Sequence, residues 1–325
     1  MISRLSTRVL RGRRTQLSRS DHVAILLSTY NGATFLAEQL DSLIQQTHKQ
    51  WTIYASDDGS SDATLDILED YQSRLGRDRL VILNGPQHGF AANFLSLLQR
   101  DEIQAPYFAF CDQDDLWTPE RLEVGVRWIH EIPAERPALF CSRTQLIDEH
   151  GLPIGYSPLF SKPPCFENAL VQSIAGGNTM LLNSAARDLL KQTPRDARII
   201  SHDWWAYILV SGCGGAVAYD KEPTIRYRQH GNNIIGSNSS LHDRLVRVRK
   251  MLGGTFREWN DANLKAISYF RNRLTRENRK TLELFEQSRR ADLPTRLRLI
   301  HQSGVHRQTL PGTLGLAAAA ILQRL

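Results

Sequence analysis

The first 130 residues alternate between short apolar runs and stretches in which apolar residues recur at helical spacing. Residues 23–28 form an apolar run rich in branched residues, which is typical of a strand buried on both faces. Leu36, Leu40 and Leu43 then recur on one helical face. Further units of this kind follow, with predicted strands at 51–56, 80–84 and 107–111. Four strand–helix units in succession predict a parallel sheet with right-handed crossovers.

The pattern becomes less regular after the fourth strand. Thr118 is expected to cap the next helix and Pro119 to open it. Further strands are predicted at 138–142, 179–182 and 215–219, a Pro-rich loop at 153–164, and helices at 203–210 and 312–323. We predict an α/β fold in which helices flank a mostly parallel sheet. The predicted parts are a basic disordered tail (1–20), a main domain (21–240) and a basic helical C-terminal extension (241–325).

The net charge of +6 at pH 7 hides an uneven distribution along the 325 residues. Residues 1–20 contain six Arg and no acid, and residues 241–325 contain 17 Lys or Arg against 7 Asp or Glu. The segment between them is therefore strongly acidic, which argues against nucleic-acid binding. Basic ends suit an anionic lipid surface, and solvated helix faces with a loose tail are the alternative.

The cysteines and the apolar runs bear on the compartment. Four widely spaced cysteines form no C-x-x-C pair, so a disulfide framework or structural zinc site is not expected, and a reducing compartment suits them. The longest apolar run, residues 314–322, is too short to span a bilayer. The Arg-rich start lacks the apolar region of a secretory signal; a disordered tail is a simpler interpretation than a mitochondrial transit peptide. We expect a cytoplasmic protein, with peripheral contact to the inner face of the cell membrane as a further option.

Polar clusters follow three of the predicted strands. They are Ser28 to Asn31, Asp57 to Asp62, and Asp112 to Asp115. Because ligands bind at the carboxyl ends of parallel strands, the carboxylates of these clusters are expected to meet at one sheet edge. Like charges raise one another's pKa unless a cation lies between them, and Mg²⁺ or Mn²⁺ with a polyphosphate suits such a site. Asp-Gly turns and acidic helix starts are the structural alternative for each cluster taken alone.

Seven short motifs occur in one order over residues 21–236. They are LLSTYNG, ASDDGSSDAT, HGFAANF, FCDQDDLWTPERL, AGGNTMLLN, HDWW and YRQHGNN. The ordered set resembles the family 2 glycosyltransferases, which are inverting nucleotide-sugar enzymes with a GT-A fold. The forms DQDDLW, HDWW and YRQHG look most like bacterial rhamnosyltransferases of surface-polysaccharide synthesis.

The resemblance implies roles for the first two clusters in binding the donor nucleotide. Ser28 and Tyr30 would line the nucleobase and ribose pocket. Asp58 would accept the imide N–H of uracil or thymine, and Asp57 beside it would support the turn.

The resemblance likewise implies a metal and diphosphate site. Asp112 and Asp114 correspond to the D-x-D motif, in which Asp114 would bind Mg²⁺ or Mn²⁺ and Asp112 would contact the ribose or the ion's water shell. Arg228 would pair with the diphosphate, and His230 would lie there too or ligate the metal; a lone surface histidine is the structural alternative. The role of Asp115 stays open.

The catalytic base implied by the resemblance is Asp203. The residue before it is usually Glu, whereas this chain has His202, which leaves the supporting role open. Gly177, Asn178 and Trp204 are expected near the donor sugar and acceptor; a plain turn before a strand and a core aromatic are the alternatives.

The predicted reaction is metal-dependent, inverting transfer of a sugar from a nucleoside diphosphate sugar to a saccharide or lipid-linked saccharide. Rhamnose from dTDP-rhamnose is the expected donor, on the resemblance alone. Two other classes stay open: an inactive GT-A-like binding protein at the membrane, and a sugar nucleotidyltransferase. The chain lacks G-x-G-x-x-G and G-x-x-x-x-G-K-[ST], which disfavours dinucleotide-binding and P-loop enzymes.

Overall fold

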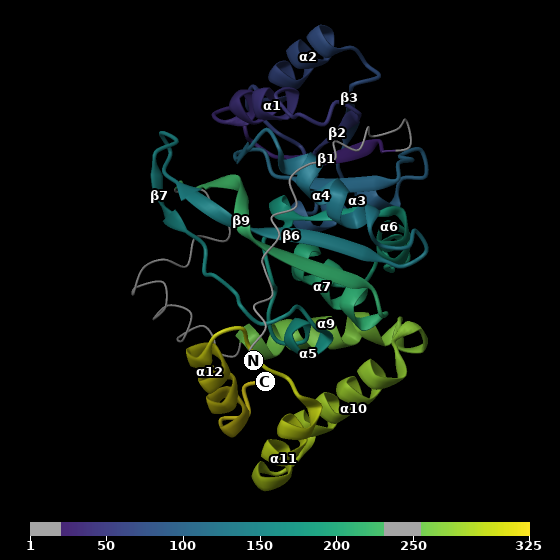
Figure 1. The fold of residues 1–325 in the computed structure, drawn as a ribbon, viewed down its shortest axis with the longest axis vertical. Helices are drawn as coiled ribbons and strands as arrows, with labels where there is room; N and C mark the ends of the chain where they lie inside the picture. Colours follow the sequence, from purple (N-terminus) through teal and green to yellow (C-terminus); the bar gives the residue numbers. More distant parts are fainter. Residues whose placement is uncertain (1–20, 231–254) are drawn as a thin grey trace, which may run out of the picture.

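The computed structural model describes residues 21–230 and 255–325 (Figure 1). The strands are β1 (Val23–Thr29), β2 (Trp51–Asp57), β3 (Leu80–Asn84), β4 (Tyr107–Cys111), β5 (Leu116–Trp117), β6 (Ala138–Ile147), β7 (Pro153–Tyr156), β8 (Leu181–Asn183) and β9 (Ala216–Arg228). The helices up to β9 are α1 (Leu36–Ile44), α2 (Thr64–Leu75), α3 (Phe90–Gln99), α4 (Arg121–His130), α5 (Phe166–Ala169), α6 (Ser184–Lys191) and α7 (His202–Gly212), with a 3₁₀ turn η1 (Gly177–Thr179). The C-terminal helices are α9 (Thr255–Ser268), α10 (Arg276–Arg290), α11 (Leu293–Ser303) and α12 (Leu310–Ile321), with a 3₁₀ turn η2 (Arg271–Arg273).

The described strands form one sheet in the order β3-β2-β1-β4-β8-β6-β9-β5, with β7 on β6. Strands β1 to β4 are mutually parallel, whereas β8 runs antiparallel to both β4 and β6. The register pairs Thr29 with Asp57, and Leu27 with Cys111, so that the polar residues following β1, β2 and β4 lie at one edge. The sheet therefore presents the expected carboxylates together.

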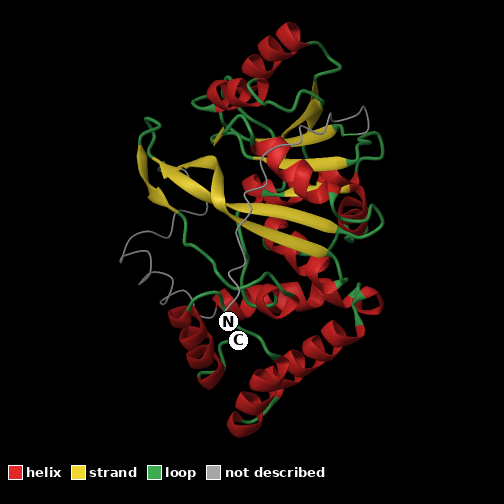
Figure 2. Cartoon of the chain, in the orientation of Figure 1, coloured by secondary structure: helices red, strands yellow, loops and turns green. Residues whose placement is uncertain are grey.

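Helices cover both faces of the sheet (Figure 2). One apolar cluster joins α1, α2 and α4 to one face and contains Val23, Ile25 and Leu27 of β1. The other cluster joins α3, α6 and α7 to the opposite face and contains Ala24 and Leu26. Successive residues of a strand point to opposite faces, so this division explains why every position of the run 23–28 is apolar or small.

The predicted α/β fold and the first four strand–helix units are confirmed, with corrections in detail. The fourth helix begins at Arg121; the Thr118 side chain makes no cap, and its carbonyl accepts the Arg121 N–H within a turn. Strands β6 and β9 extend well past their predicted ends at 142 and 219. The polar stretch 220–223 was hard to recognise as strand because it falls where the register between β6 and β9 shifts. Strands β5 and β7, in segments without alternation, and helices α5 and α6 were not predicted.

The predicted C-terminal extension is helical from Thr255 onward and shares the apolar cluster of α7. Trp204 packs edge-on against Trp259, with ring centroids 6.3 Å apart, and Trp205 packs against Phe270 at 5.8 Å. The predicted tail 1–20 and the boundary at residue 240 lie outside the described residues, so the domain division stays a prediction. Among the described helices, none has the length and apolarity needed to cross a bilayer.

Candidate active site

The turn after β2 is organised by the Asp57 carboxylate. One of its oxygens accepts the Thr29 hydroxyl at 2.9 Å and the Ser60 hydroxyl at 2.6 Å. The other accepts the backbone N–H groups of Gly59 and Ser60 at 3.1 and 2.8 Å. Gly59 has φ +95°, a conformation that favours glycine. Asp57 therefore holds the turn closed and ties it to the end of β1.

The neighbouring Asp58 orders the loop that follows β3. Its two oxygens accept the N–H groups of Gln87 at 2.6 Å and Gly89 at 2.8 Å. A carboxylate oxygen has two acceptor positions, so each Asp58 oxygen retains capacity for another donor. Asp58 consequently orders the 87–89 segment, and its predicted contact with the imide N–H of a nucleobase stays a prediction.

Two amide side chains, Asn93 and Gln113, position the predicted nucleotide-binding residues. The Asn93 amide donates to the Ser28 hydroxyl at 2.8 Å. The Gln113 side chain accepts the Tyr30 N–H at 2.8 Å and donates to the Tyr30 carbonyl at 3.0 Å. Gly32 permits this clasp, because a Cβ at that position would lie 2.3 Å from the Gln113 oxygen. Neither amide was predicted as a site residue. The only signal in the sequence is that Asn93 lies in the HGFAANF motif and Gln113 in FCDQDDLWTPERL.

The three acids after β4 have different environments. The Asp114 carboxylate lies 2.7 Å from the His230 Nε2 atom. Asp115 is fully buried; its oxygens accept the Asn178 amide at 2.5 Å and the Arg228 N–H at 3.1 Å. Burial raises the pKa of Asp115 well above its usual value, and the charges of Asp114 and Asp112 add to this. Asp115, whose role was left open, ties together β9 and the η1 turn beneath the site.

Asp112 links the two halves of the site electrostatically. Burial, together with the smaller effects of the nearby charges of Asp114 and Asp203, raises the pKa of Asp112 to about 8. Asp203 belongs to the first turn of α7, 91 positions further along the sequence. Its charge acts on Asp112, so the structure brings the predicted base and the D-x-D acids into one neighbourhood.

The Asp203 carboxylate is 9% exposed and partly satisfied by hydrogen bonds. It accepts the Ser201 hydroxyl and the Trp204 N–H, the latter at 2.6 Å. Burial raises the pKa of Asp203 to about 6, while the N–H groups of Trp204 and Gly177 act in the opposite direction. At neutral pH the group is mostly ionised and close to the range in which a carboxylate accepts a proton readily.

His202 lies in an aromatic pocket. Its ring stacks on Phe94 with centroids 4.0 Å apart and meets Phe110 edge-on at 4.7 Å. The ring is 4% exposed, and neither nitrogen has a hydrogen-bond partner among the described residues. Burial lowers the pKa of His202 to about 3, so the imidazole is neutral. His202 therefore braces the start of α7 by packing, with no carboxylate in the place where the family usually has Glu.

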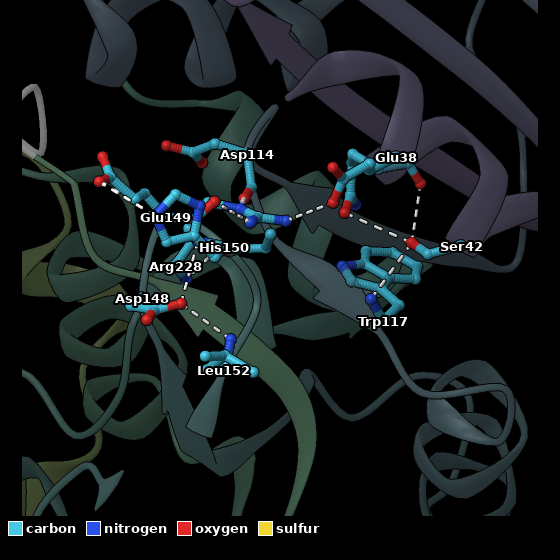
Figure 3. Close-up of polar contacts among 11 residues, drawn as sticks. Glu38, Ser42, Asp114, Trp117, Asp148, Glu149, His150, Leu152 and Arg228 are labelled. Carbon is cyan, nitrogen blue, oxygen red and sulfur yellow. Dashed lines mark hydrogen bonds and ion pairs between the residues drawn. The ribbon is translucent and has the colours of Figure 1, made fainter. Parts of the chain in front are cut away.

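Arg228 is the centre of a contact network at the end of β9 (Figure 3). Its guanidinium is 1% exposed, lies over the Phe35 ring at 4.5 Å and donates to the Glu38 carboxylate at 2.6 Å. It also donates to the backbone carbonyls of Asp114 and Glu149 at 3.0 and 2.9 Å. The side chain thus joins α1, the acidic loop after β4 and the β6–β7 turn. Its predicted pairing with a diphosphate stays a prediction, beside these contacts with protein groups.

Comparison with known proteins shows to which family this chain belongs. The sequence model described as Glycosyl transferase family 2 matches residues 24–190, just over half of the chain. The chain belongs to glycosyl transferase family 2. Its fold and its enzymatic class therefore follow from both the sequence and the structure.

Individual relatives of this family 2 glycosyltransferase are distant. The dTDP-rhamnosyl transferase RfbG of Shigella flexneri is 26% identical over 235 residues, covering 68% of this chain and 78% of the relative. The putative teichuronic acid biosynthesis glycosyltransferase TuaG of Bacillus subtilis is 25% identical over 217 residues, covering 66% and 82%. The crystal structure of S. aureus TarS 1-349 in complex with UDP-GlcNAc has a TM-score of 0.53 at 14% identity, covering 93% of this chain and 89% of that one. This structural likeness shows the GT-A fold.

The residues predicted to contact the sugar or acceptor, Gly177, Asn178 and Trp204, lie near Asp203 and are all buried. Asn178 is buried and its amide is engaged by Asp115, and Gly177 directs its backbone toward Asp203. Trp204 is also buried, and its indole N–H donates to the Ala169 carbonyl at 2.7 Å. Their predicted contacts with sugar or acceptor stay predictions, and all three have structural contacts of their own.

A divalent cation fits the donor groups present at the glycosyltransferase site. Among residues 21–230 and 255–325, no three His, Cys, Asp or Glu side chains converge to enclose an ion. Asp114 with His230, and Asp112 nearby, offer two to three oxygen and nitrogen donors beside a partly open surface. Mg²⁺ is commonly held by one or two carboxylates together with substrate phosphates, and this set is compatible with that arrangement.

Gly177 has no room for a side chain. A Cβ there would lie 2.1 Å from the His202 Nε2 atom, and the aromatic stack leaves that ring little space to move. We expect Gly177→Ala to displace the start of α7, to lower the transfer rate at least about tenfold and to lower stability by about 1–3 kcal/mol. A double-mutant cycle with His202→Ala checks this: the cost should be smaller when the imidazole is absent. An equal cost in both backgrounds would contradict the steric argument.

Proposed function

We propose that this chain is a metal-dependent, inverting glycosyltransferase. It moves a sugar from a nucleoside diphosphate donor to a hydroxyl of a saccharide or lipid-linked saccharide in bacterial polysaccharide synthesis. The observation that carries the proposal is the buried Asp203 carboxylate, whose pKa is raised to about 6 and whose charge acts on Asp112. A base and a set of acids that suit a cation and a diphosphate share one site, as displacement at an anomeric carbon requires.

In this mechanism Asp203 removes the proton of the acceptor hydroxyl as that oxygen attacks the anomeric carbon. The acceptor oxygen must approach within about 3 Å of the carboxylate, on the face opposite the departing diphosphate. The Trp204 and Gly177 N–H groups hold the carboxylate in orientation while burial keeps it basic. Attack from that face inverts the anomeric configuration.

The departing diphosphate is held on the other side of the sugar. Asp114, His230 and Asp112 would bind Mg²⁺ or Mn²⁺, which neutralises charge developing on the diphosphate and orients it. Ser28, Tyr30 and Asp58 would bind the nucleoside. Arg228 keeps the acidic loop in place through the Asp114 carbonyl, which supports a positioning role beside the predicted phosphate contact.

The donor we propose is dTDP-rhamnose. Two observations support it: the DQDDLW, HDWW and YRQHG motifs, and the similarity to a dTDP-rhamnosyl transferase. The similarity to a teichuronic acid glycosyltransferase supports a role in surface-polysaccharide synthesis. We place the reaction in the cytoplasm, with the basic C-terminal helices in peripheral contact with the membrane that presents the acceptor.

Thermal stabilisation by nucleotide sugars tests the donor assignment. With Mn²⁺ and donor at about 100 times Kd, dTDP-rhamnose should stabilise the fold by about 2.7 kcal/mol, which is a rise in Tm of several degrees. Chelation of the metal should reduce this rise. An adenosine diphosphate sugar serves as the matched control, because adenine lacks the imide N–H that Asp58 is predicted to accept. The assignment fails if no thymidine or uridine diphosphate sugar raises Tm.

Activity measurements separate this proposal from the other two classes. An enzyme should release the nucleoside diphosphate from its sugar, and this release should be lost when Asp203 is replaced. An inactive binding protein should show no such release. Formation of a nucleoside diphosphate sugar from a nucleoside triphosphate would instead indicate a nucleotidyltransferase. The absence of a Gly-rich, basic triphosphate loop after β1, where the sequence reads STYNGATF, favours the transferase.

A further inference from the structure

The C-terminal helices enclose a cavity of 360 Å³ whose lining side chains have a net positive charge. Its lining contains two acids, Asp261 and Glu286, and five cations, Arg257, Lys265, Arg289, Arg290 and Arg296. Arg257, Asp261 and Lys265 recur at intervals of four and so share one face of α9. The spacing along α9 places Arg257 and Lys265 on the same face, and the packing of α9, α10 and α11 brings the cations of the three helices together.

Both acids of the cavity already have cationic partners. Arg289 lies 2.7 Å from Asp261 and also donates to the Leu325 backbone oxygen at 2.8 Å. Glu286 is paired with Arg271 at 2.6 Å. Within the described parts of the chain, the exposed cations Arg257, Lys265 and Arg290 have no ion pair. The cavity consequently has an excess of positive charge that its own acids do not neutralise.

Arg296 supplies an independent indication that the cavity suits an anion. Its side chain is 3% exposed, and its terminal nitrogens donate to the carbonyls of Ala320 and Ala291 at 3.0 and 2.5 Å. Its Nε atom is buried and has no hydrogen-bond partner among the described residues, and none of their carboxylates pairs with it. A buried charge without a counter-ion is unfavourable, and a bound anion in the adjoining cavity would compensate it.

We propose that this cavity is a second binding site, which takes a phosphate or diphosphate group. Guanidinium groups match phosphate oxygens in a forked geometry, and several unpaired cations suit a group with more than one negative charge. At about 30 Å³ of liquid per water molecule, the cavity has room for such a group with part of its hydration shell.

The phosphate has two possible sources with the same chemistry: a free phosphorylated solute or a lipid headgroup. The neighbouring helix α12 exposes Leu310, Leu314 and Ile321, whose spacing places them along one side of the helix. The site is separate from the transfer reaction, so its failure would leave the proposed glycosyltransferase activity untouched.

Calorimetric titration with inorganic pyrophosphate in the presence of a chelator tests the free source. Sedimentation with phosphatidylcholine vesicles, with and without phosphatidic acid, tests the lipid source. The full chain should bind at least one of these anions at low ionic strength. The double variant Arg257→Ala/Arg290→Ala should weaken that binding at least about tenfold, because it removes two charge-assisted contacts from exposed positions.

Arg298→Ala is the matched control, since Arg298 is an exposed cation of α11 outside the cavity. The affinity of the Arg298→Ala variant for the anion should stay within about twofold of that of the unmodified chain. The rate of sugar transfer should be unchanged in the double variant. Binding of pyrophosphate alone would assign a soluble ligand, and binding only to phosphatidic acid vesicles would assign a lipid. Binding of neither anion, or an equal loss in the control and the double variant, would overturn the proposal.

Discussion

Asp203→Asn should lower kcat/KM by about 10²–10⁴-fold, the usual contribution of a positioned general base. The asparagine has nearly the same shape and can still accept the N–H of Trp204, but it cannot take the acceptor proton. In the unmodified enzyme, kcat/KM should rise with pH through the region near 6, because Asp203 must lose its proton before it can act. Steady-state kinetics with the donor found by thermal stabilisation measure both effects. A loss of less than tenfold would refute the base assignment.

The same variant should not be less stable than the unmodified protein at neutral pH. Burial raises the folded pKa of Asp203 from 3.8 to about 6, so the folded state binds the proton more tightly than the unfolded state does. Ionisation therefore costs stability as pH rises from about 4 to about 6, and the full cost of about 3 kcal/mol is present above that window. The Tm of Asp203→Asn relative to the parent should increase across this window. A uniform drop in Tm at every pH would indicate a structural role instead.

Arg228→Met should destabilise the protein by about 3 kcal/mol and lower Tm by roughly 6 °C. The substitution removes the donors to the Asp114 and Glu149 carbonyls and the ion pair with Glu38, while keeping much of the packing on Phe35. Because Glu38 is more than half exposed, its carboxylate can return to water, which moderates the cost. Thermal unfolding measures the change.

Donor affinity separates the two roles considered for Arg228. A positioning role predicts a lower Tm together with a reduced kcat, since the loop that carries Asp114 loses its support. A direct phosphate contact predicts weaker donor binding in addition to the lower Tm. Glu38→Gln is the matched control, because it removes the charge of the partner but keeps an acceptor oxygen. It should change the free energy of unfolding by less than about 1 kcal/mol.

The first half of the fold was predictable because local periodicity specifies it. Strands β1 to β4 consist mostly of apolar residues and lie between helices with clear apolar faces. Strand β9 was only partly predicted, because Asp220, Lys221, Glu222 and Pro223 in its middle have the composition of a turn. Its pairing with β6 tolerates that stretch through a register shift, which single-sequence patterns do not reveal.

The candidate site shows the same division between local and non-local information. Acids that directly follow strands could be placed at one sheet edge from topology alone. The partner of each polar side chain could not be predicted in this way. Glu38 and Arg228, for example, are 190 positions apart and meet because α1 packs against β5, which pairs with β9. Likewise, Gln113 reaches back 83 positions to clasp the Tyr30 backbone. Motif spacing indicated where the chemistry occurs, and tertiary structure was needed to show how the groups are held.

The continuous core between α7 and the C-terminal helices limits how this enzyme can be re-engineered. Asp203 begins the helix whose aromatic residues Trp204 and Trp205 interlock with Trp259 and Phe270. A chimera that exchanged residues 255–325 with those of a relative would replace half of that interlocking surface and thereby disturb α7, which carries the proposed base. A chimera that folds would have to carry matching residues on α7 as well. We therefore expect α7 and residues 255–325 to change together among relatives.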